Sequence, residues 1–191
     1  HGGNSEIAIG EALARHPRES FCIATKFPGY DLSNMDKVEE IFERQLEKTG
    51  MGYFDFYLIH NVCEMNIDEY LNPEHGIMPY LLTQKEAGRI RHLGFSAHGA
   101  IPVMERFLEA YGEHMEFCQI QLNFLDWQLQ DARGKVELLK KWNLPVWVME
   151  PVRGGKLAQI TDEEAERLHA LRPDESTVAW AFRLIQGCLL Y

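Results

Sequence analysis

Polar and ionisable side chains stand at the carboxyl ends of several apolar stretches of this sequence. They are, in chain order, Lys26, His60, Ser96, His98, Gln119, Gln121, Asn123 and Glu150. Ligands bind at the carboxyl edge of a parallel β-sheet, so a functional site is expected here if the stretches are neighbouring parallel strands. An ammonium group and an imidazole at one such edge are suited to proton transfer and to stabilising negative charge on oxygen.

The direction of these side chains follows from the two-residue period of a strand. Side chains two positions apart share a face, which groups Cys22 with Ala24 and Lys26, Phe56 with Leu58 and His60, and Gln119 with Gln121 and Asn123. The small side chains that precede Lys26 leave room for its amine inside the protein. We therefore expect Lys26 and His60 to converge on a common pocket.

Each of these residues also has an ordinary structural interpretation. A single lysine at a strand end is usually a surface amine, and a single histidine is more often a hydrogen-bonded core group than a catalyst. A row of amides such as Gln119, Gln121 and Asn123 fits a solvated edge, but strands covered by helices on both faces do not have one. Their joint occurrence at successive strand ends favours a functional site.

The order of elements along the chain predicts how these residues are positioned. Strands are expected over residues 21–27, 53–60, 90–98, 117–124 and 144–152, and helices over 5–16, 33–52, 80–88, 100–112, 131–143, 161–171 and 176–186. This alternation predicts an α/β protein with a parallel sheet, either an open doubly wound sheet or a closed (β/α)₈ barrel. No linker divides the sequence, so residues 1–191 are expected to form a single domain.

Two local features complete this prediction. Ser5 is the expected N-cap of the first helix, with Ile7 and Ile9 on its apolar face. Residues 62–76 are the one long loop, and long loops after strands tend to build active sites.

The composition and charge exclude several classes of partner. Hydrophobic residues make up 46% of the 191 residues and charged residues 25%, as in ordinary globular proteins. The net charge of −10 argues against nucleic acid and anionic membrane surfaces as partners. No apolar run is long enough to span a bilayer and no signal peptide is recognisable, so the protein is expected in the cytoplasm. The four cysteines are too scattered for a metal site or a disulfide framework.

Six segments that occur in a fixed order resemble a known family. They are HGGNSEIAIGEAL, IATKFP, YFDFYLIHNV, RIRHLGFSAHG, CQIQLNFLDW and VMEPVRGGKL, and together they are similar to the aldo/keto reductases, especially to the bacterial branch that often carries an iron–sulfur tail. The resemblance covers nearly the whole chain. It implies a (β/α)₈ TIM barrel, of which this chain holds about five strands, the third to the seventh. The chain is therefore expected to be a fragment that lacks the N-terminal and C-terminal parts of the barrel.

The resemblance also implies an activity. Members of the family reduce aldehydes and ketones by hydride transfer from NADP(H), bound without a glycine-rich Rossmann turn, and they use an Asp, a Tyr, a Lys and a His. Lys26 and His60 match the last two. The tyrosine and the aspartate are expected upstream of His1, so the fragment is expected to be inactive alone. In this mechanism Lys26 lowers the pKa of the tyrosine, and His60 orients the carbonyl oxygen.

The same comparison implies which residues bind the cofactor. Ser96 and Gln119 match the groups that bind the nicotinamide carboxamide, while Ala97 and His98 stand where the family usually has an asparagine. The segment after the seventh strand matches Glu150, Pro151, Val152, Arg153, Gly154, Gly155 and Lys156. Its two glycines allow close approach of the pyrophosphate, which Arg153 or Lys156 neutralises. NADP(H) and a small carbonyl compound are thus the implied ligands.

Two other functions fit part of the pattern. A reductase-like subunit that binds NADP(H) and senses or regulates redox state, with little turnover, would keep the cofactor residues. A lyase that forms a Schiff base with Lys26 would also use an amine at a strand end of a barrel, but it leaves His60, Ser96 and Gln119 without a shared role. Carbonyl reduction is the interpretation that gives all of these residues a part.

Overall fold

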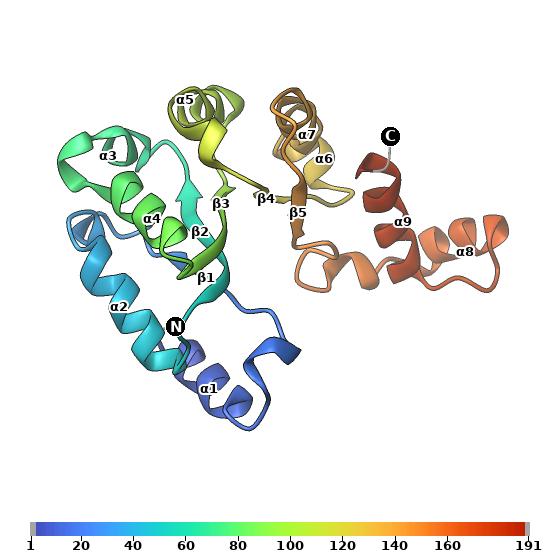
Figure 1. Ribbon diagram of the computed structural model, residues 1–191. Helices are drawn as coiled ribbons and strands as arrows, with labels where there is room; N and C mark the ends of the chain where they lie inside the picture. Colours follow the sequence, from blue (N-terminus) through green and yellow to red (C-terminus); the bar gives the residue numbers. More distant parts are fainter. Residues whose placement is uncertain (1–2, 190–191) are drawn as a thin grey trace. The chain divides into compact units, whose positions relative to one another are not determined.

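Strands and helices alternate along the chain, as the sequence predicts (Figure 1). In the computed structural model, which describes residues 3–189, the five strands are hydrogen-bonded to one another in the order in which they occur in the chain. This order is typical of successive βα units in a parallel sheet. The expected α/β class is confirmed. The chain divides into two parts, unit 1 up to Cys118 and unit 2 from Gln119.

The described residues of unit 1, from residue 3 on, hold three strands and five α-helices. They are β1 (Ala24–Phe27), β2 (Phe54–Val62) and β3 (Ile90–Ala97), with α1 (Asn4–Leu13), α2 (Val38–Thr49), α3 (Ile67–Leu71), α4 (Ile77–Glu86) and α5 (Ile101–Tyr111). Short 3₁₀ helices lie at Arg18–Ser20, Leu32–Asn34, Pro73–His75 and Gly112–His114. Strand β2 pairs with both β1 and β3 in parallel, and the register places Lys26 opposite Leu58 and Leu58 opposite Gly94.

The core of unit 1 lies between one face of these strands and the helices. Phe42 of α2 contacts Phe54 and Tyr57 of β2, with ring centroids 5.9 and 5.2 Å apart. Phe107 of α5 stands 4.7 Å from Phe95 of β3, again between ring centroids. All five side chains are fully buried. Strand side chains that alternate with Tyr57 in β2 and with Phe95 in β3, which include those of His60 and Ser96, point to the other face.

Unit 2 holds most of β4 (Cys118–Gln121), all of β5 (Val146–Met149) and four α-helices in its described residues. The helices are α6 (Asp126–Leu129), α7 (Ala132–Lys141), α8 (Asp162–Leu171) and α9 (Thr177–Leu189), and a 3₁₀ helix lies at Lys156–Ala158. The N–H of Leu122, just after β4, donates to the carbonyl of Met149 in β5 (3.2 Å). In the described part of the chain, no helix has the length and apolarity to cross a bilayer.

The first helix departs from its expected boundaries. Its N-cap is Gly3 (φ 82°), and Ser5, the predicted cap, lies inside the helix. Ile7 and Ile9 are 42% and 46% exposed instead of buried. Gly10 is the only fully buried residue of α1, and it brings the backbone of α1 directly against the end of α2. A contact made through a glycine does not appear in the hydrophobic periodicity of the sequence, and for this reason the buried face of α1 was predicted wrongly.

Two short helices were not predicted. Residues 62–76, expected as a loop, contain α3 and a 3₁₀ helix, and the connection between β4 and α7 contains α6. Each begins near a buried asparagine whose side-chain oxygen accepts backbone hydrogen bonds, Asn66 from Cys63 and Asn123 from Leu125 and Asp126. Such local side-chain bonds start a helical turn without any apolar pattern.

The glycine contact between α1 and α2 yields a test of this packing. A Cβ at position 10 would lie 2.6 Å from the carbonyl oxygen of Thr49. We expect Gly10→Ala to lower the free energy of unfolding by about 1–3 kcal/mol, because the backbone it meets cannot move aside freely. In α9, a Cβ at position 187 meets no described atom within 4 Å, so Gly187→Ala is expected to raise that free energy by about 0.5–1 kcal/mol. Urea unfolding followed by circular dichroism measures both, and effects of the same sign would contradict the packing.

Candidate active site

Lys26 lies near the end of β1, on the face turned away from the helices. Its neighbours point the other way: the hydroxyl of Thr25 donates to Oε1 of Glu6 (2.9 Å), and Phe27 is fully buried. Burial lowers the pKa of the Lys26 amine from its usual value of 10.5. Among the described residues, no carboxylate forms an ion pair with this amine.

The backbone of Lys26 is held by a buried amide of α2. Nε2 of Gln45 donates to the carbonyl of Lys26 (2.8 Å), and Oε1 of Gln45 accepts from the hydroxyl of Tyr57 (2.7 Å). Because Tyr57 belongs to β2, these bonds connect α2 to both strands at the level of the amine. Sequence reasoning missed Gln45, although a polar residue between Phe42 and Leu46 on the buried stripe of a helix was the available signal.

His60 lies on the corresponding face of β2 and is half-buried. Burial, and then the charges of Lys26 and His98, lower its pKa to about 4. The imidazole is therefore neutral at pH 7, with one nitrogen that donates and one that accepts. The ring of Tyr30 stands edge-on to it, with 5.6 Å between the ring centroids. The structure thus brings Lys26, His60 and His98 together, and Tyr30 is a neighbour that the sequence did not reveal.

The backbone at His60 is fixed by the segment that follows β1. The hydroxyl of Tyr70, in α3, donates to the carbonyl of His60. Gly29 packs against this bond, and a Cβ there would come within 1.7 Å of the Tyr70 hydroxyl oxygen. Nδ2 of Asn66 donates to the carbonyls of Gly29 (3.0 Å) and Asn61 (3.1 Å), which ties the ends of β1 and β2 together. The glycine of the Phe-Pro-Gly turn is therefore required by this packing.

Ser96 and His98 lie at the end of β3. Ser96 is fully buried, and within the described residues its hydroxyl oxygen has no hydrogen-bond partner. Buried hydroxyls without a partner are uncommon in native proteins and call for an explanation, such as a ligand or a water molecule. The side chain of His98 is exposed, and its backbone N–H donates to the carbonyl of Val62 at the end of β2 (3.1 Å).

In unit 2 the amides of β4 and the residues after it divide into two kinds. Oε1 of Gln119 is buried, and no described group bonds to it. Gln121 and Asn123 both donate to Oδ2 of Asp126, at 2.6 and 2.5 Å. Asn123 and Asp126 are fully buried. Gln119 is therefore available to a ligand, whereas the other two amides serve the protein, and Asp126 is a further residue that sequence reasoning missed.

The segment 150–156 has an unusual backbone. The angle φ is 58° at Glu150, 49° at Arg153, 62° at Gly154 and 87° at Gly155. The N–H groups of Gly155 and Leu157 both donate to the carbonyl of Val152, at 3.0 and 3.1 Å, which closes the loop on itself. The N–H groups of Arg153 and Lys156 also donate within the loop, to the carbonyls of Glu150 and Arg153. The N–H groups of Val152 and Gly154 have no partner among the described residues, and free N–H groups in a left-handed turn can bind an anion. Lys156 is exposed, whereas Arg153 forms an ion pair with Asp126 at 3.7 Å.

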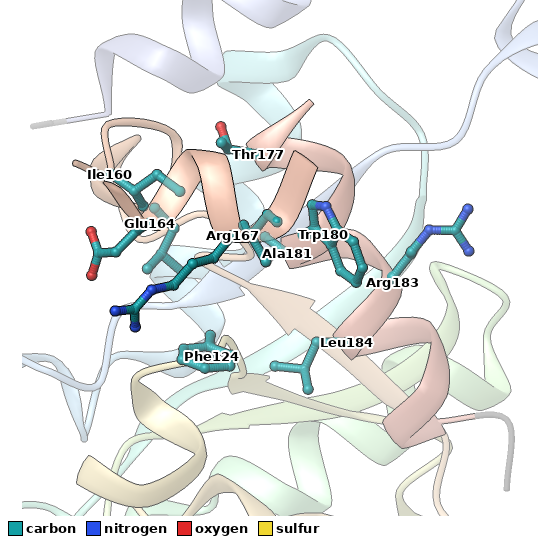
Figure 2. A pocket seen from close by; sticks show the side chains of 11 residues that line it. Phe124, Ile160, Glu164, Arg167, Thr177, Trp180, Ala181, Arg183 and Leu184 are labelled. Atoms are coloured by element: carbon teal, nitrogen blue, oxygen red, sulfur yellow. The ribbon is translucent and has the colours of Figure 1, made fainter. Parts of the chain in front are cut away.

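A cavity of about 540 Å³ lies in unit 2 directly after this loop (Figure 2). Its walls are mainly apolar and include Phe124, Leu157 and Trp180. The indole nitrogen of Trp180 is buried without a hydrogen-bond partner in the part of the chain that the structure describes. Figure 2 shows the guanidinium groups of Arg167 and Arg183 extending to opposite sides of the cavity. Its size is that of a small-molecule site, although none of the residues predicted for the site lines it.

The strand ends of unit 1 combine a cationic amine with a neutral hydrogen-bond donor. Such a pair stabilises negative charge that develops on an oxygen atom, because the amine favours the anion and the imidazole holds it in place. Residues 3–189 hold no group of three His, Cys, Asp or Glu side chains arranged to bind a metal ion.

The proximity of Lys26 to His60 can be tested by titration. In NMR spectra of the chain with labelled histidines, we expect His60 to titrate near pH 4, below its usual 6.5. Lys26→Met removes the ammonium and should raise the pKa of His60, but not to 6.5, because burial is the larger cause. Lys37→Met, which removes an exposed ammonium elsewhere in unit 1, is the control. Equal values for His60 in the two variants would contradict the arrangement.

The lowered pKa of His60 also predicts a loss of stability in acid. Between pH 6.5 and about 4 the unfolded chain binds a proton at position 60 and the folded chain does not. The stabilisation linked to the neutral imidazole is therefore complete above pH 6.5 and is lost as the pH falls toward 4. Urea unfolding at a series of pH values should show that the free energy of unfolding falls between pH 6.5 and about 4. The variant His60→Asn should show a smaller fall over this range. A variant with the same fall as the parent would rule out the buried neutral imidazole.

Curated proteins with similar sequences are reductases by name. The chain is 24% identical over 172 residues to a protein named NADH-specific methylglyoxal reductase from Escherichia coli (strain K12), a match that covers 81% of this chain and 50% of that protein. It is 29% identical over 94 residues to an aldo-keto reductase from Mycobacterium avium (strain 104), covering 48% of this chain and 31% of that protein. The chain thus spans half the length, or less, of these two relatives.

Solved structures show the same fold. An aldo/keto reductase from Brucella melitensis matches with a TM-score of 0.71 and 22% identity, over 93% of this chain and 64% of that one. An aldo/keto reductase from Klebsiella pneumoniae, in complex with NADP and acetate, matches with a TM-score of 0.65 and 20% identity, over 92% of this chain and 59% of that one. The expected (β/α)₈ barrel class is confirmed by this likeness, and the five strands are a part of such a barrel. A model of the "Aldo/keto reductase family" matches residues 1–185, and the chain therefore belongs to that family.

Proposed function

We propose that this chain provides the lysine, the histidine and the cofactor-binding groups of an oxidoreductase that reduces aldehyde or ketone carbonyls with NADP(H). The observation that carries the proposal is the Lys26 amine beside a neutral His60 at the ends of β1 and β2. Membership of the aldo/keto reductase family supports the class of reaction.

His60 is the residue that we assign to the carbonyl oxygen of the substrate. A neutral imidazole donates one N–H hydrogen bond, which orients and polarises the carbonyl. The ammonium of Lys26 favours negative charge on a nearby oxygen, including the phenol oxygen of a tyrosine that gives its proton to the product. We expect this tyrosine, and an aspartate that pairs with Lys26, upstream of His1. When bound, the dinucleotide supplies the hydride.

Ser96 and Gln119 suit the carboxamide of a nicotinamide. A carboxamide carries a carbonyl oxygen that accepts and an NH₂ group that donates. The hydroxyl of Ser96 can donate to the first, and Oε1 of Gln119 accepts from the second; within the described chain both oxygens are buried and unpartnered. Ala97 and His98 stand where the family usually has an asparagine, and we assign His98 to the same end of the cofactor.

The loop of unit 2 suits the pyrophosphate. We assign to it Glu150, Pro151, Val152, Arg153, Gly154, Gly155 and Lys156. Its left-handed backbone and two glycines let an anion approach the main chain closely. The cavity of Figure 2 begins at Leu157, the residue after the loop, and its aromatic and aliphatic walls suit the adenine ring.

NADP(H) is the cofactor we propose, and a comparison with NADH tests the choice. The relative from Escherichia coli is named NADH-specific, whereas the Klebsiella pneumoniae structure contains NADP. Methylglyoxal, which appears in the name of the first, is a suitable first carbonyl compound to assay. A cytoplasmic location, a single domain over residues 1–191 and a relation to the iron–sulfur branch stay predictions from the sequence.

An NADP(H)-binding, redox-sensing subunit with little turnover is the second candidate. It is supported by the oxygens of Ser96 and Gln119, which are buried and unpartnered within the described residues. These oxygens suit a bound cofactor whether or not turnover follows. A Schiff-base lyase would also use an amine with a lowered pKa. It gives Ser96 and Gln119 no role, so we expect borohydride to trap no adduct of methylglyoxal on Lys26 beyond that on exposed lysines such as Lys37.

Turnover is the direct test of the proposed function. We expect residues 1–191 to bind NADPH without reducing methylglyoxal, because we place the proton donor upstream of them. A chain extended upstream to include the expected aspartate and tyrosine should consume NADPH. In that protein Lys26→Met and His60→Gln should each lower kcat/KM by about 100- to 10,000-fold, while Lys37→Met should leave it unchanged.

Each outcome separates the candidates. Turnover by residues 1–191 alone would place the proton donor within them and contradict the proposed division of roles. Binding of NADPH by the extended chain, without hydride transfer in a single turnover, would favour the redox-sensing subunit.

A further inference from the structure

A buried carboxylate lies next to the loop that we assign to the pyrophosphate. Asp126, the first residue of α6, is fully buried. Its Oδ2 accepts hydrogen bonds from the amides of Gln121 (2.6 Å) and Asn123 (2.5 Å). Its Oδ1 accepts none from the described residues. A carboxylate in such a place needs a counter-ion, because burying an unpaired charge is strongly unfavourable.

Arg153, in the loop, is that counter-ion. Its Nη2 lies 3.7 Å from Oδ1 of Asp126, within the range of an ion pair but too far for a hydrogen bond. The side chain of Arg153 is 32% exposed, so it stands between the buried acid and solvent. Arg153 also has a φ of 49°, which is costly for a residue with a Cβ and persists only where its surroundings hold it.

Asn123 connects the same acid to the start of the loop. One of its amide hydrogens donates to Asp126, and the other to the carbonyl of Glu150 (3.0 Å). Its Oδ1 accepts from the backbone N–H groups of Leu125 and Asp126, both at 3.0 Å. The amide thus uses its full bonding capacity. Both ends of the segment 150–153 are therefore tied to Asp126, one through Asn123 and the other through Arg153.

The second cation of the loop is placed differently. Lys156 is exposed, and its amine forms no hydrogen bond or ion pair with any described residue. The neighbouring backbone is open as well, because a Cβ at Gly155 would meet no described atom within 4 Å. Lys156 is free to meet an anion that approaches the loop.

We propose that Asp126 is a positioning residue of the dinucleotide site: it holds Arg153 away from a bound pyrophosphate and fixes the loop, so that Lys156 makes the charge contact. This inference rests on the proposed function, and it narrows the choice between Arg153 and Lys156 to the lysine. The reason is charge balance. If Arg153 moved to the ligand, the buried carboxylate would be left unpaired beside a second anion.

Two matched variants separate a positioning charge from a contact charge. Arg153→Met and Lys156→Met each remove one positive charge from the same loop and keep an unbranched side chain. The readout is the dissociation constant of NADPH, measured by fluorescence at several salt concentrations. Salt screens an exposed contact with phosphate, so Lys156→Met should weaken binding and reduce its dependence on salt. Arg153→Met should weaken binding on the order of tenfold and leave the salt dependence as in the parent.

Asp126→Asn supplies the other half of the test. In the double variant Asp126→Asn/Arg153→Met, NADPH should bind no more weakly than in Arg153→Met, because both changes remove the same link. Tighter binding by Asp126→Asn than by the parent chain would overturn the proposal, since it would mean that a released Arg153 serves the ligand. A reduced salt dependence in Arg153→Met would overturn it as well.

Urea unfolding separates a failure of this inference from a failure of the proposed function. If the parent chain binds no dinucleotide, the proposed function fails, and the link between Asp126 and Arg153 is judged by the unfolding midpoints alone. Shifts in the double variant smaller than the sum of the single shifts support the link, and additive shifts overturn it. The double variant removes both members of the pair and leaves no unpaired buried charge, so it remains folded and measurable where Arg153→Met is strongly destabilised.

Discussion

The parallel register of β1 and β2 is the constraint on which the candidate site depends. Lys26 pairs with Leu58, so the amine and the imidazole of His60 project from the same face at neighbouring strand ends. A slip by one residue would turn the side chains of a strand to the opposite face and drive the amine into the aromatic core. The register is held from that core, where Tyr57 contacts Phe42 and donates its hydroxyl hydrogen bond to α2.

The two units control charge in different ways. In unit 1 the amine of Lys26 has no carboxylate partner among the described residues, and burial lowers its pKa and that of His60. In unit 2 the carboxylate of Asp126 is matched by Arg153. Both follow from the cost of charge in a poorly solvated place, which lowers the pKa of the two basic groups in unit 1 and is met by a counter-ion in unit 2. In unit 1 the amine and the imidazole are left available to a substrate, and in unit 2 the ion pair fixes the conformation of the loop that holds Arg153.

Much of the fold and part of the site follow from local sequence patterns. Apolar periodicity predicted the five strands and the longer helices, and strand alternation predicted the face from which Lys26 and His60 project. Two of the missed features depend on a partner distant in the chain. Gln45 binds the backbone of Lys26, and Gly10 packs against the end of α2. The cavity in unit 2 could not be predicted because its walls look like the apolar stripes of two ordinary helices.

The proposed function requires that His60 face the nicotinamide ring of the bound dinucleotide. Nuclear Overhauser effects between bound NADPH and a chain with labelled histidines measure this directly. We expect magnetisation transfer between the nicotinamide ring protons and the ring protons of His60, and none between His60 and the adenine protons. If NADPH binds but its nicotinamide shows no transfer to His60, the proposed function is contradicted. Transfer between the adenine and His60 would contradict it as well.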